Sequence, residues 1–228
     1  ELKQILKKAI LEEKMKIKIK ILPTSYPQGS ELQLIAKITG KKIKKGELPI
    51  NKGVVVSNVS TIKSIYDAFT NGIPLVERIV TVSGESLSKI GNYIIKIGTP
   101  LEHIIKTLKP NENSKIIFGG PMMGQEIFEN STATIKGTSG ILFLKNEGEI
   151  ERNNCILCGY CVEVCPMNLM PLEFAEFYEK NEYKMMAKAN IMSCIECGAC
   201  EYACPSRVPL IESIKNGKET LIRMEGNK

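Results

Sequence analysis

The sequence predicts a multidomain protein that combines an α/β part with an α+β part, and three changes of pattern predict it. Segments typical of strands and helices alternate over residues 1–74, and short strands surround one helix over residues 75–146. Cysteines with short helices follow over residues 147–228. The 228 residues, 43% of them hydrophobic, are enough to bury a core. We therefore expect three domains with these bounds.

The first part opens with an amphipathic helix. Its apolar side chains recur at helical spacing: Leu2, Ile5, Leu6, Ala9 and Ile10. Because the chain starts at Glu1, without methionine and directly in this helix, we expect it to be a segment of a longer protein. Lys16–Ile21 then alternates lysine with isoleucine, which predicts a half-buried strand.

Two further helices in this part carry capping signals. Ser30 is expected to cap the first, with Gln33 completing a capping box and Gly40 lying just past its end. Gly53–Ser57 is apolar and β-branched, which predicts a strand, and Ser60 is expected to cap the helix after it. Alternating strand–helix units are typical of an α/β sheet that binds ligands near its helix N-termini.

The second part is predicted to be a small α+β module. Its strands are expected at Leu75–Val82, Tyr93–Ile97, Lys115–Phe118 and Ile141–Leu144. Leu101–Leu108 is helix-like and contains His103, the only histidine, which we interpret as a structural or surface residue. In the third part we expect helices at Pro171–Lys180, Glu182–Asn190 and Val208–Lys215, with a frayed tail after Asn216.

Two copies of a twelve-residue pattern contain all eight cysteines of the chain. Cys155–Pro166 and Cys194–Pro205 both read C-x2-C-x2-C-x3-C-P, the run that holds [4Fe–4S] clusters in bacterial two-cluster ferredoxins. Three cysteines at i, i+3 and i+6 on a tight loop can direct their sulfurs to three corners of one cube. Gly159 and Gly198 let the backbone approach the cluster. The pattern predicts a protein that moves single electrons.

The fourth cysteine of each run is expected to bind the cluster of the other run, as in paired motifs of this kind. The ligands of the first cluster would be Cys155, Cys158, Cys161 and Cys204. The ligands of the second would be Cys165, Cys194, Cys197 and Cys200. Three methionines near the second run are expected to shield the clusters from water: Met185, Met186 and Met192.

Zinc and disulfides are the alternatives for these cysteines. Zinc sites usually combine two distant C-x2-C pairs or add histidines, whereas here four cysteines crowd each run. Disulfides suit a small secreted chain, and no signal peptide is visible. A structural module stabilised by zinc remains the alternative to iron–sulfur clusters. The cysteine content favours a reducing compartment.

The charge of the chain does not indicate nucleic-acid binding. The net charge is +6, and two oxidised four-thiolate clusters of about −2 each would bring it to about +2. A short basic run has no interleaved aromatic residues and is interpreted as a solvated turn: Lys41, Lys42, Lys44 and Lys45. No apolar stretch approaches the roughly 18 residues of a membrane helix, so we expect membrane association only through partners.

Five stretches outside the cysteine runs carry a more specific resemblance. They are YPQGSELQLI (Tyr26–Ile35), LPINKGVVVSNVSTI (Leu48–Ile62), IGTPLEHII (Ile97–Ile105), GGPMMGQ (Gly119–Gln125) and KGTSGILFL (Lys136–Leu144). With the two cysteine runs after them, they make essentially the whole chain similar to the C subunit of the Rnf complex, a membrane-bound ferredoxin:NAD oxidoreductase.

The resemblance implies three domains. Residues 1–74 would be the C-terminal part of an FMN/NADH-binding α/β domain, 75–146 a β-grasp (SLBB) domain, and 147–228 a two-cluster ferredoxin-like domain. The first also resembles the flavin-binding subunit of respiratory complex I. On that likeness the residues expected at FMN and NADH are Gly29, Ser30, Glu31, Asn58 and Thr61.

This flavin pocket departs from the family pattern. Ser30 stands where the family has an acidic residue, and Ser57 and Ser60 replace an asparagine and a glutamate. The family's glycine-rich phosphate loop would lie upstream of Glu1. We therefore expect at most half a flavin pocket here, and no tight FMN binding or activity from this chain alone.

The resemblance implies an electron-transfer subunit that passes electrons between NADH, FMN, two [4Fe–4S] clusters and partner subunits. The partners would be other subunits of a membrane complex and a ferredoxin-type protein, and the subunit would lie peripherally on the cytoplasmic side of the membrane. Two alternatives stay open. One is a cobalamin-reducing flavo-iron–sulfur protein, and the other is a pure iron–sulfur adaptor with no active site of its own.

Overall fold

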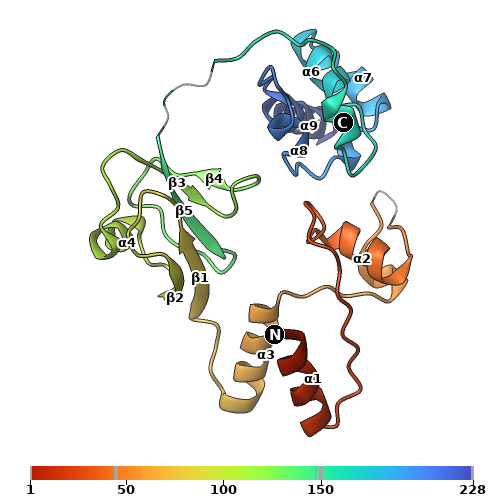
Figure 1. The fold of residues 1–228 in the computed structure, drawn as a ribbon. Helices are drawn as coiled ribbons and strands as arrows, with labels where there is room; N and C mark the ends of the chain where they lie inside the picture. Colours follow the sequence, from red (N-terminus) through yellow and green to blue (C-terminus); the bar gives the residue numbers. More distant parts are fainter. Residues whose placement is uncertain (1, 44–45, 147, 149–150, 227–228) are drawn as a thin grey trace. The chain divides into compact units, whose positions relative to one another are not determined.

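The structure is a computed structural model that describes residues 2–43, 46–146, 148 and 151–226 (Figure 1). By its internal contacts the chain divides into Glu1–Val56 and Ser57–Lys228. Lys41 and Lys42 of the basic run are exposed, while Lys44 and Lys45 lie outside the described residues.

The first unit contains helices and extended segments. Its elements are α1 (Leu2–Glu12), α2 (Glu31–Thr39) and the 3-10 helix η1 (Pro49–Lys52). The predicted helix boundaries at α2 are confirmed, with Ser30 at the N-cap position and Gly40 at a φ of 73° as the C-cap. The capping box is wrong, because the Ser30 side chain makes no cap bond and its backbone N–H already donates to Pro27 O at 2.9 Å.

The strands predicted at Lys16–Ile21 and Gly53–Ser57 are wrong. Neither segment forms a strand, and among residues 2–43 and 46–56 there is no other strand to pair with. Alternation makes a strand only where a neighbour accepts and donates the ladder hydrogen bonds. Lys20 donates instead to the carbonyls of Lys37 and Ile38, both at 3.1 Å, at the end of α2.

The second unit begins with α3 (Val59–Asn71). The predicted cap at Ser60 is wrong by two residues. Asn58 is the N-cap, and its Oδ1 accepts a hydrogen bond from the Ser60 backbone N–H at 2.9 Å. Gly72, at a φ of 66°, ends the helix.

A five-stranded mixed sheet follows, and the four predicted strands are confirmed in it. The strands are β1 (Glu77–Ser83), β2 (Gly91–Lys96), β3 (Ser114–Phe118), β4 (Gln125–Glu126) and β5 (Gly140–Lys145), in the order β2-β1-β5-β3-β4. β1 and β5 are parallel, and the other neighbours are antiparallel. The two-residue β4 has too short a pattern to be seen in the sequence.

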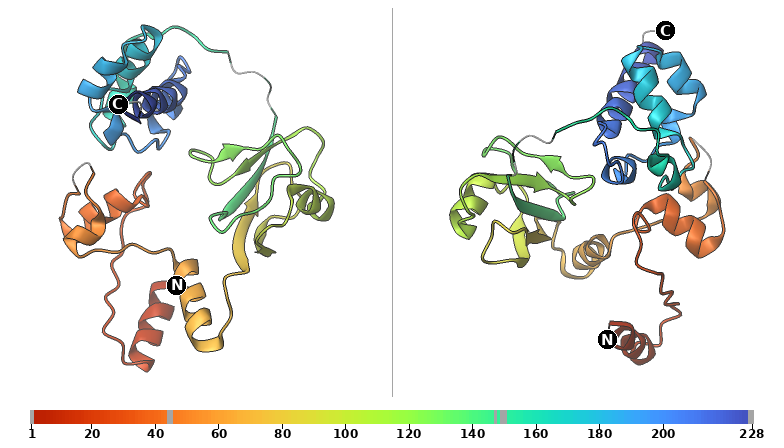
Figure 2. Two further views of the ribbon diagram at one scale, coloured as in Figure 1. Left: turned by 180° about the vertical axis from the view of Figure 1, so that it is seen from behind. Right: turned by 45° about the horizontal axis from the view of Figure 1, so that its top comes forward.

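Helix α4 (Leu101–Leu108) connects β2 to β3, covers the sheet and matches its predicted bounds (Figures 1 and 2). Its buried face, Leu101, Ile104 and Leu108, packs with Val82 and Phe143 of the sheet. His103 lies on the exposed side of the helix. Gly84 has a φ of 123°, and a Cβ there would collide with the Phe143 backbone, so only glycine fits.

Residues 151–226, which we call the cluster module, are helical. The helices are α5 (Tyr160–Glu163), α6 (Pro171–Glu179), α7 (Tyr183–Lys188), η2 (Ile191–Ser193), α8 (Ala199–Tyr202) and α9 (Leu210–Gly226). α6 packs on α9 around a core with fully buried Phe174, Met186 and Ile214 (Figure 1).

The frayed tail predicted after Asn216 is wrong, because α9 continues through the last described residues. Leu210, Ile214, Gly217 and Leu221 fall on one face at helical spacing, and all four are buried. Burial of this face stabilises a helix whose outer face is polar. Among the described residues, no helix is both long and apolar enough to cross a membrane.

Candidate iron–sulfur site

The two cysteine runs have nearly the same backbone. In each, a glycine with positive φ, Gly159 at 81° and Gly198 at 78°, precedes a four-residue helix, α5 or α8. The residue before the second cysteine is also left-handed in both, with a φ of 57° at Leu157 and 53° at Glu196. The third cysteine lies in the short helix, and the fourth follows its end.

The structure brings the eight cysteines into two groups, and each group draws on both runs. The first pocket is lined by the thiols of Cys155, Cys158, Cys161 and Cys204, with apolar neighbours such as Ile156 and Leu172. The second pocket is lined by Cys165, Cys194, Cys197 and Cys200, with neighbours such as Leu169 and Phe174. The fourth cysteine of each run thus lies beside the first three of the other.

Backbone N–H groups point at four of the sulfurs in a repeated pattern. The first cysteine of each run accepts from the residue two positions on, so that Leu157 donates to Cys155 and Glu196 to Cys194, both at 3.4 Å. The fourth accepts from the residue four positions on, with Leu169 donating to Cys165 Sγ at 3.3 Å and Val208 to Cys204 Sγ at 3.4 Å. Such donors stabilise thiolates and raise the reduction potential of a bound cluster.

The two pockets differ in exposure. Cys155 and Cys158 are exposed, whereas Cys197 and Cys200 are buried. Burial, with the neighbouring Cys194 thiol, raises the pKa of Cys200 to about 12. Burial also raises the pKa of Cys161 and Cys194 above the ordinary thiol value. A higher pKa disfavours the thiolate, and a bound iron would favour it.

Each pocket brings four thiol side chains together. Zinc requires four ligand atoms about 2.0–2.3 Å from one centre. Over the described part of the chain, no group of three or more His, Cys, Asp or Glu side chains is arranged to hold a metal ion. The four cysteines that line each apolar pocket match the number and type of ligands that a [4Fe–4S] cluster would take.

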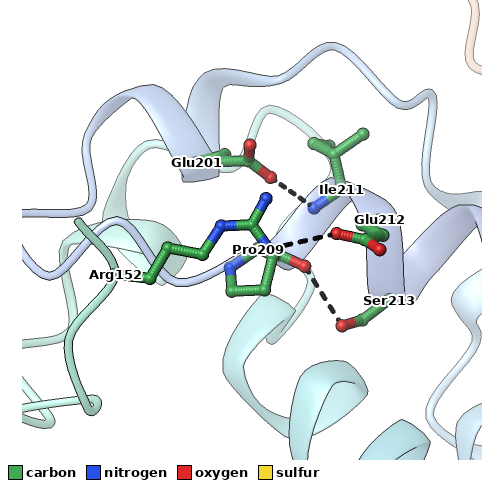
Figure 3. Close-up of polar contacts among 6 residues, drawn as sticks. All are labelled: Arg152, Glu201, Pro209, Ile211, Glu212 and Ser213. Carbon is green, nitrogen blue, oxygen red and sulfur yellow. Dashed lines mark hydrogen bonds and ion pairs between the residues drawn. The ribbon is translucent and has the colours of Figure 1, made fainter. Parts of the chain in front are cut away.

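Contacts at the start of α9 join this helix to α8 and to the segment ahead of the first cysteine run (Figure 3). Glu201 of α8 accepts a hydrogen bond through Oε2 from the Ile211 backbone N–H at 2.8 Å. Arg152, ahead of the first run, pairs with Glu212 at 3.3 Å. Ser213 Oγ of α9 donates to the carbonyl of Pro209, just ahead of the helix, at 3.1 Å.

Some residues around the pockets carry no local sequence signal. Lys218 of α9 donates to the carbonyl of Cys194, which lies 24 residues earlier in the sequence. This contact depends on how α9 packs and has no local sequence pattern. Of the three methionines expected near the clusters, Met186 is fully buried, and Met192 packs with Cys165 and Cys194 against the same core. Met185 is 40% exposed.

The residues expected at a flavin fall in both units. Gly29 and Ser30 precede α2, and Glu31 is its first residue, in the first unit. Asn58 caps α3, and Thr61 lies in its first turn, in the second unit. The Asn58 side chain accepts from Ser60, so this oxygen already serves as a helix cap. Their role at FMN stays a prediction.

Two family models match the chain. Residues 1–67 match the Nuo51 FMN-binding domain, and residues 154–208 match the 4Fe-4S dicluster domain. The dicluster match contains both cysteine runs, so the chain carries a segment for two [4Fe–4S] clusters and part of an FMN-binding domain.

Curated relatives align over most of the chain. The C subunit of a Na(+)-translocating ferredoxin:NAD(+) oxidoreductase complex from Acetobacterium woodii is 43% identical over 93% of this chain and 49% of the relative. The C subunits of ion-translocating oxidoreductase complexes from Rhodobacter capsulatus and Buchnera aphidicola are 40% and 36% identical. They align over 92% and 96% of this chain, and over 41% and 48% of their own lengths. The chain is therefore a homologue of the C subunits of ion-translocating oxidoreductase complexes, and it spans about half their length.

Proposed function

We propose that the cluster module holds two [4Fe–4S] clusters and carries single electrons between them. The observation that carries the proposal is the pair of four-cysteine pockets, each built from both runs. The ligands of the first cluster are Cys155, Cys158, Cys161 and Cys204. The ligands of the second are Cys165, Cys194, Cys197 and Cys200.

The protein around each pocket prepares it for one-electron chemistry, which the clusters supply when bound. Apolar neighbours line both pockets, for example Leu172 in the first and Phe174 in the second. Backbone N–H groups offset negative charge on the sulfurs of Cys155, Cys165, Cys194 and Cys204. Because these groups are fixed by the fold, little reorganisation is needed when the charge changes by one electron.

In the complete protein we propose an electron-transfer subunit of a membrane-associated ferredoxin:NAD oxidoreductase. Two of the relatives carry ferredoxin:NAD(+) oxidoreductase in their names, and this chain aligns with about half of each. NADH and FMN would exchange a hydride, and FMN would then release electrons singly to the two clusters and on to partner subunits, or the reverse. The subunit would lie peripherally on the cytoplasmic side of the membrane, with the other members of the complex and a ferredoxin-type protein as partners.

The domain assignment is part of the proposal. Residues 1–74 would complete an FMN/NADH-binding α/β domain, for which the match over residues 1–67 is the support. Residues 75–146 would be a β-grasp (SLBB) domain, for which the strand order β2-β1-β5-β3-β4 with α4 after β2 is the support. Residues 147–228 would be the ferredoxin-like domain. Gly29, Ser30, Glu31, Asn58 and Thr61 would contribute only part of a flavin pocket, so this chain alone is expected to be inactive.

An anaerobic visible and EPR titration with NADH tests the proposal on the full-length protein. We expect flavin and cluster absorbance to bleach together and reduced [4Fe–4S] signals to appear. If dithionite reduces the clusters but NADH does not, the NADH site is wrong and an electron-carrying adaptor remains. Colourless protein with zinc and no iron would overturn the cluster assignment as well.

A further inference from the structure

One lysine of α9 reaches into the ligand loop of the second pocket. Lys218 Nζ donates to the backbone carbonyl of Cys194 at 2.6 Å and to Glu196 Oε1 at 2.6 Å. The Lys218 side chain is only 13% exposed, and that of Glu196 is 32% exposed. The Lys180–Glu176 pair of the same module, by contrast, lies at the surface with more than half of each side chain exposed. Lys218 therefore places a largely buried positive charge next to the backbone of Cys194.

Glu196 occupies a fixed place next to a ligand sulfur. It lies between Cys194 and Cys197 in a left-handed conformation with a φ of 53°, and its backbone N–H donates to Cys194 Sγ at 3.4 Å. Its carboxylate pairs with Lys218 of α9, which also donates to the Cys194 carbonyl of this loop. Both members of the ion pair thus contact the segment that carries Cys194.

The first run provides an internal comparison at the same position. Leu157 has a φ of 57° and donates to Cys155 Sγ at 3.4 Å, so its backbone repeats that of Glu196. Its side chain, however, is apolar and 75% exposed. The backbone of the loop does not require a carboxylate here, so the Glu196–Lys218 pair must be explained by something that differs between the two pockets.

We propose that the Lys218–Glu196 pair is a positioning and electrostatic element of the second cluster, and that it sets the reduction potential of this cluster separately from that of the first. This inference rests on the proposed function, in which Cys194 and its three partners hold a [4Fe–4S] cluster. Lys218 fixes the loop through the Cys194 carbonyl, and Glu196 balances the lysine charge beside the cluster.

The two members of the pair act on the potential in opposite directions. A four-thiolate cluster is negative when oxidised and gains one more negative charge when it accepts one electron. The ammonium of Lys218 therefore favours the reduced form, and the carboxylate of Glu196 opposes it. Because Lys218 is largely buried, solvent screens its charge less than that of an exposed lysine.

EPR-monitored redox titration of the chain with both clusters loaded tests the pair. Lys218→Met leaves Glu196 unbalanced, and we expect the equilibrium constant for reducing the second cluster to fall about tenfold, which is about 59 mV for one electron. Glu196→Gln leaves the lysine unbalanced, and we expect a shift of similar size in the opposite direction. The double variant should return close to the original potential.

Two controls separate electrostatics from structure. Lys218→Arg keeps the positive charge, so it should change the reduction potential of the second cluster much less than Lys218→Met does. Leu157→Gln, at the matched position of the first run, should leave the second potential unchanged. The first cluster should keep its potential in the Lys218 and Glu196 variants.

The outcomes distinguish this inference from the proposed function. Opposite shifts in the single variants that cancel in the double variant support the pair. Equal potentials in all variants, or shifts of the same sign in both single variants, overturn the inference while the two-cluster assignment stands. If Lys218→Met fails to retain the cluster, Glu196→Gln still decides by the sign of its shift. If the unsubstituted chain binds no second cluster, the proposed function fails, and the inference fails with it.

Discussion

The two cysteine pockets share a backbone and differ in what surrounds it. Both have the left-handed residue before the second cysteine, the glycine before a short helix, and N–H donors to the first and fourth sulfurs. Yet Cys155 and Cys158 are exposed, with Ile156 and Leu157 65% and 75% exposed beside them, while Cys197 and Cys200 are buried. The twelve-residue motif thus determines how sulfurs are presented, and residues outside it determine the environment of the cluster.

The difference arises from the helices that follow the first run. Phe174 of α6, Met186 of α7 and Ile214 of α9 form a core against which Cys165 and Cys194 pack. Water is therefore kept from one side of the second pocket. The first pocket thus belongs to the solvent side of the module and the second to its interior.

Loss of a ligand is expected to have the largest effect and to affect the two pockets unequally. Cys158→Ala and Cys197→Ala should each reduce the iron content from about eight to about four atoms per chain, because each removes one of four ligands. Cys197→Ala should also lower the thermal stability of the cluster module more, because Cys197 is buried and metal binding contributes to folding. Iron analysis and thermal circular dichroism measure both effects, and equal melting curves would contradict the difference in burial.

Removal of iron by a chelator should also affect the two pockets unequally. On anaerobic titration with a chelator, the first cluster should be lost before the second, because its ligands Cys155 and Cys158 are exposed. The course is followed by the EPR signals of the reduced protein at each step. Simultaneous loss of both clusters would show that exposure does not control access.

A packing substitution should weaken the core behind the second pocket. A Cβ at Gly217 of α9 would overlap the end of the fully buried Met186 side chain, which would then have to shift within the core. Gly217→Ala is therefore expected to cost about 1–3 kcal/mol in the free energy of unfolding. Gly226 lies in the same helix with open space around its Cβ position, so Gly226→Ala is the matched control and should not destabilise the module. Equal stability of the two variants in denaturant titrations would contradict this packing.

The helix contacts in Figure 3 should have smaller effects. Glu201→Ala removes the acceptor for the Ile211 N–H and is expected to cost about 1 kcal/mol, like the loss of a helix cap. Glu201→Gln keeps an oxygen acceptor and should recover most of that loss. Arg152→Ala breaks an exposed ion pair with Glu212 and should cost between about 0 and 1 kcal/mol. Urea titrations rank the three, and a larger loss for Arg152→Ala would reverse the expected order.

The sequence predicted the regular parts of the fold because their signals are local. The strands of the sheet, the helix Leu101–Leu108 and the cap at Gly40 follow from periodicity and turn chemistry that depend on neighbouring residues only. The predicted strands Lys16–Ile21 and Gly53–Ser57 depend on a partner strand that the described residues of that unit lack. The end of α9 depends on the burial of Leu221, which a polar tail in the sequence conceals.

The candidate site, like the fold, is predicted by the sequence where its signals are local and not where it depends on packing. The spacing of cysteines within each run predicted that its first three sulfurs lie close together, and the two-cluster ferredoxin pattern predicted that the fourth lies with the other run. The contact between Lys218 and Glu196 joins residues 22 positions apart and depends on how α9 packs. The expected flavin residues Gly29 and Thr61 belong to separate units, so local patterns cannot show whether they meet.

The most direct test of the two shared pockets is an EPR-monitored redox titration of Cys204→Ala. Cys204 belongs to the second run but lines the first pocket, with Cys155, Cys158 and Cys161. We predict that this variant loses the first cluster, as Cys158→Ala does, and keeps the second cluster with its potential unchanged. Loss of the second cluster instead, as in Cys197→Ala, would mean that each run binds its own cluster and would contradict the two shared pockets.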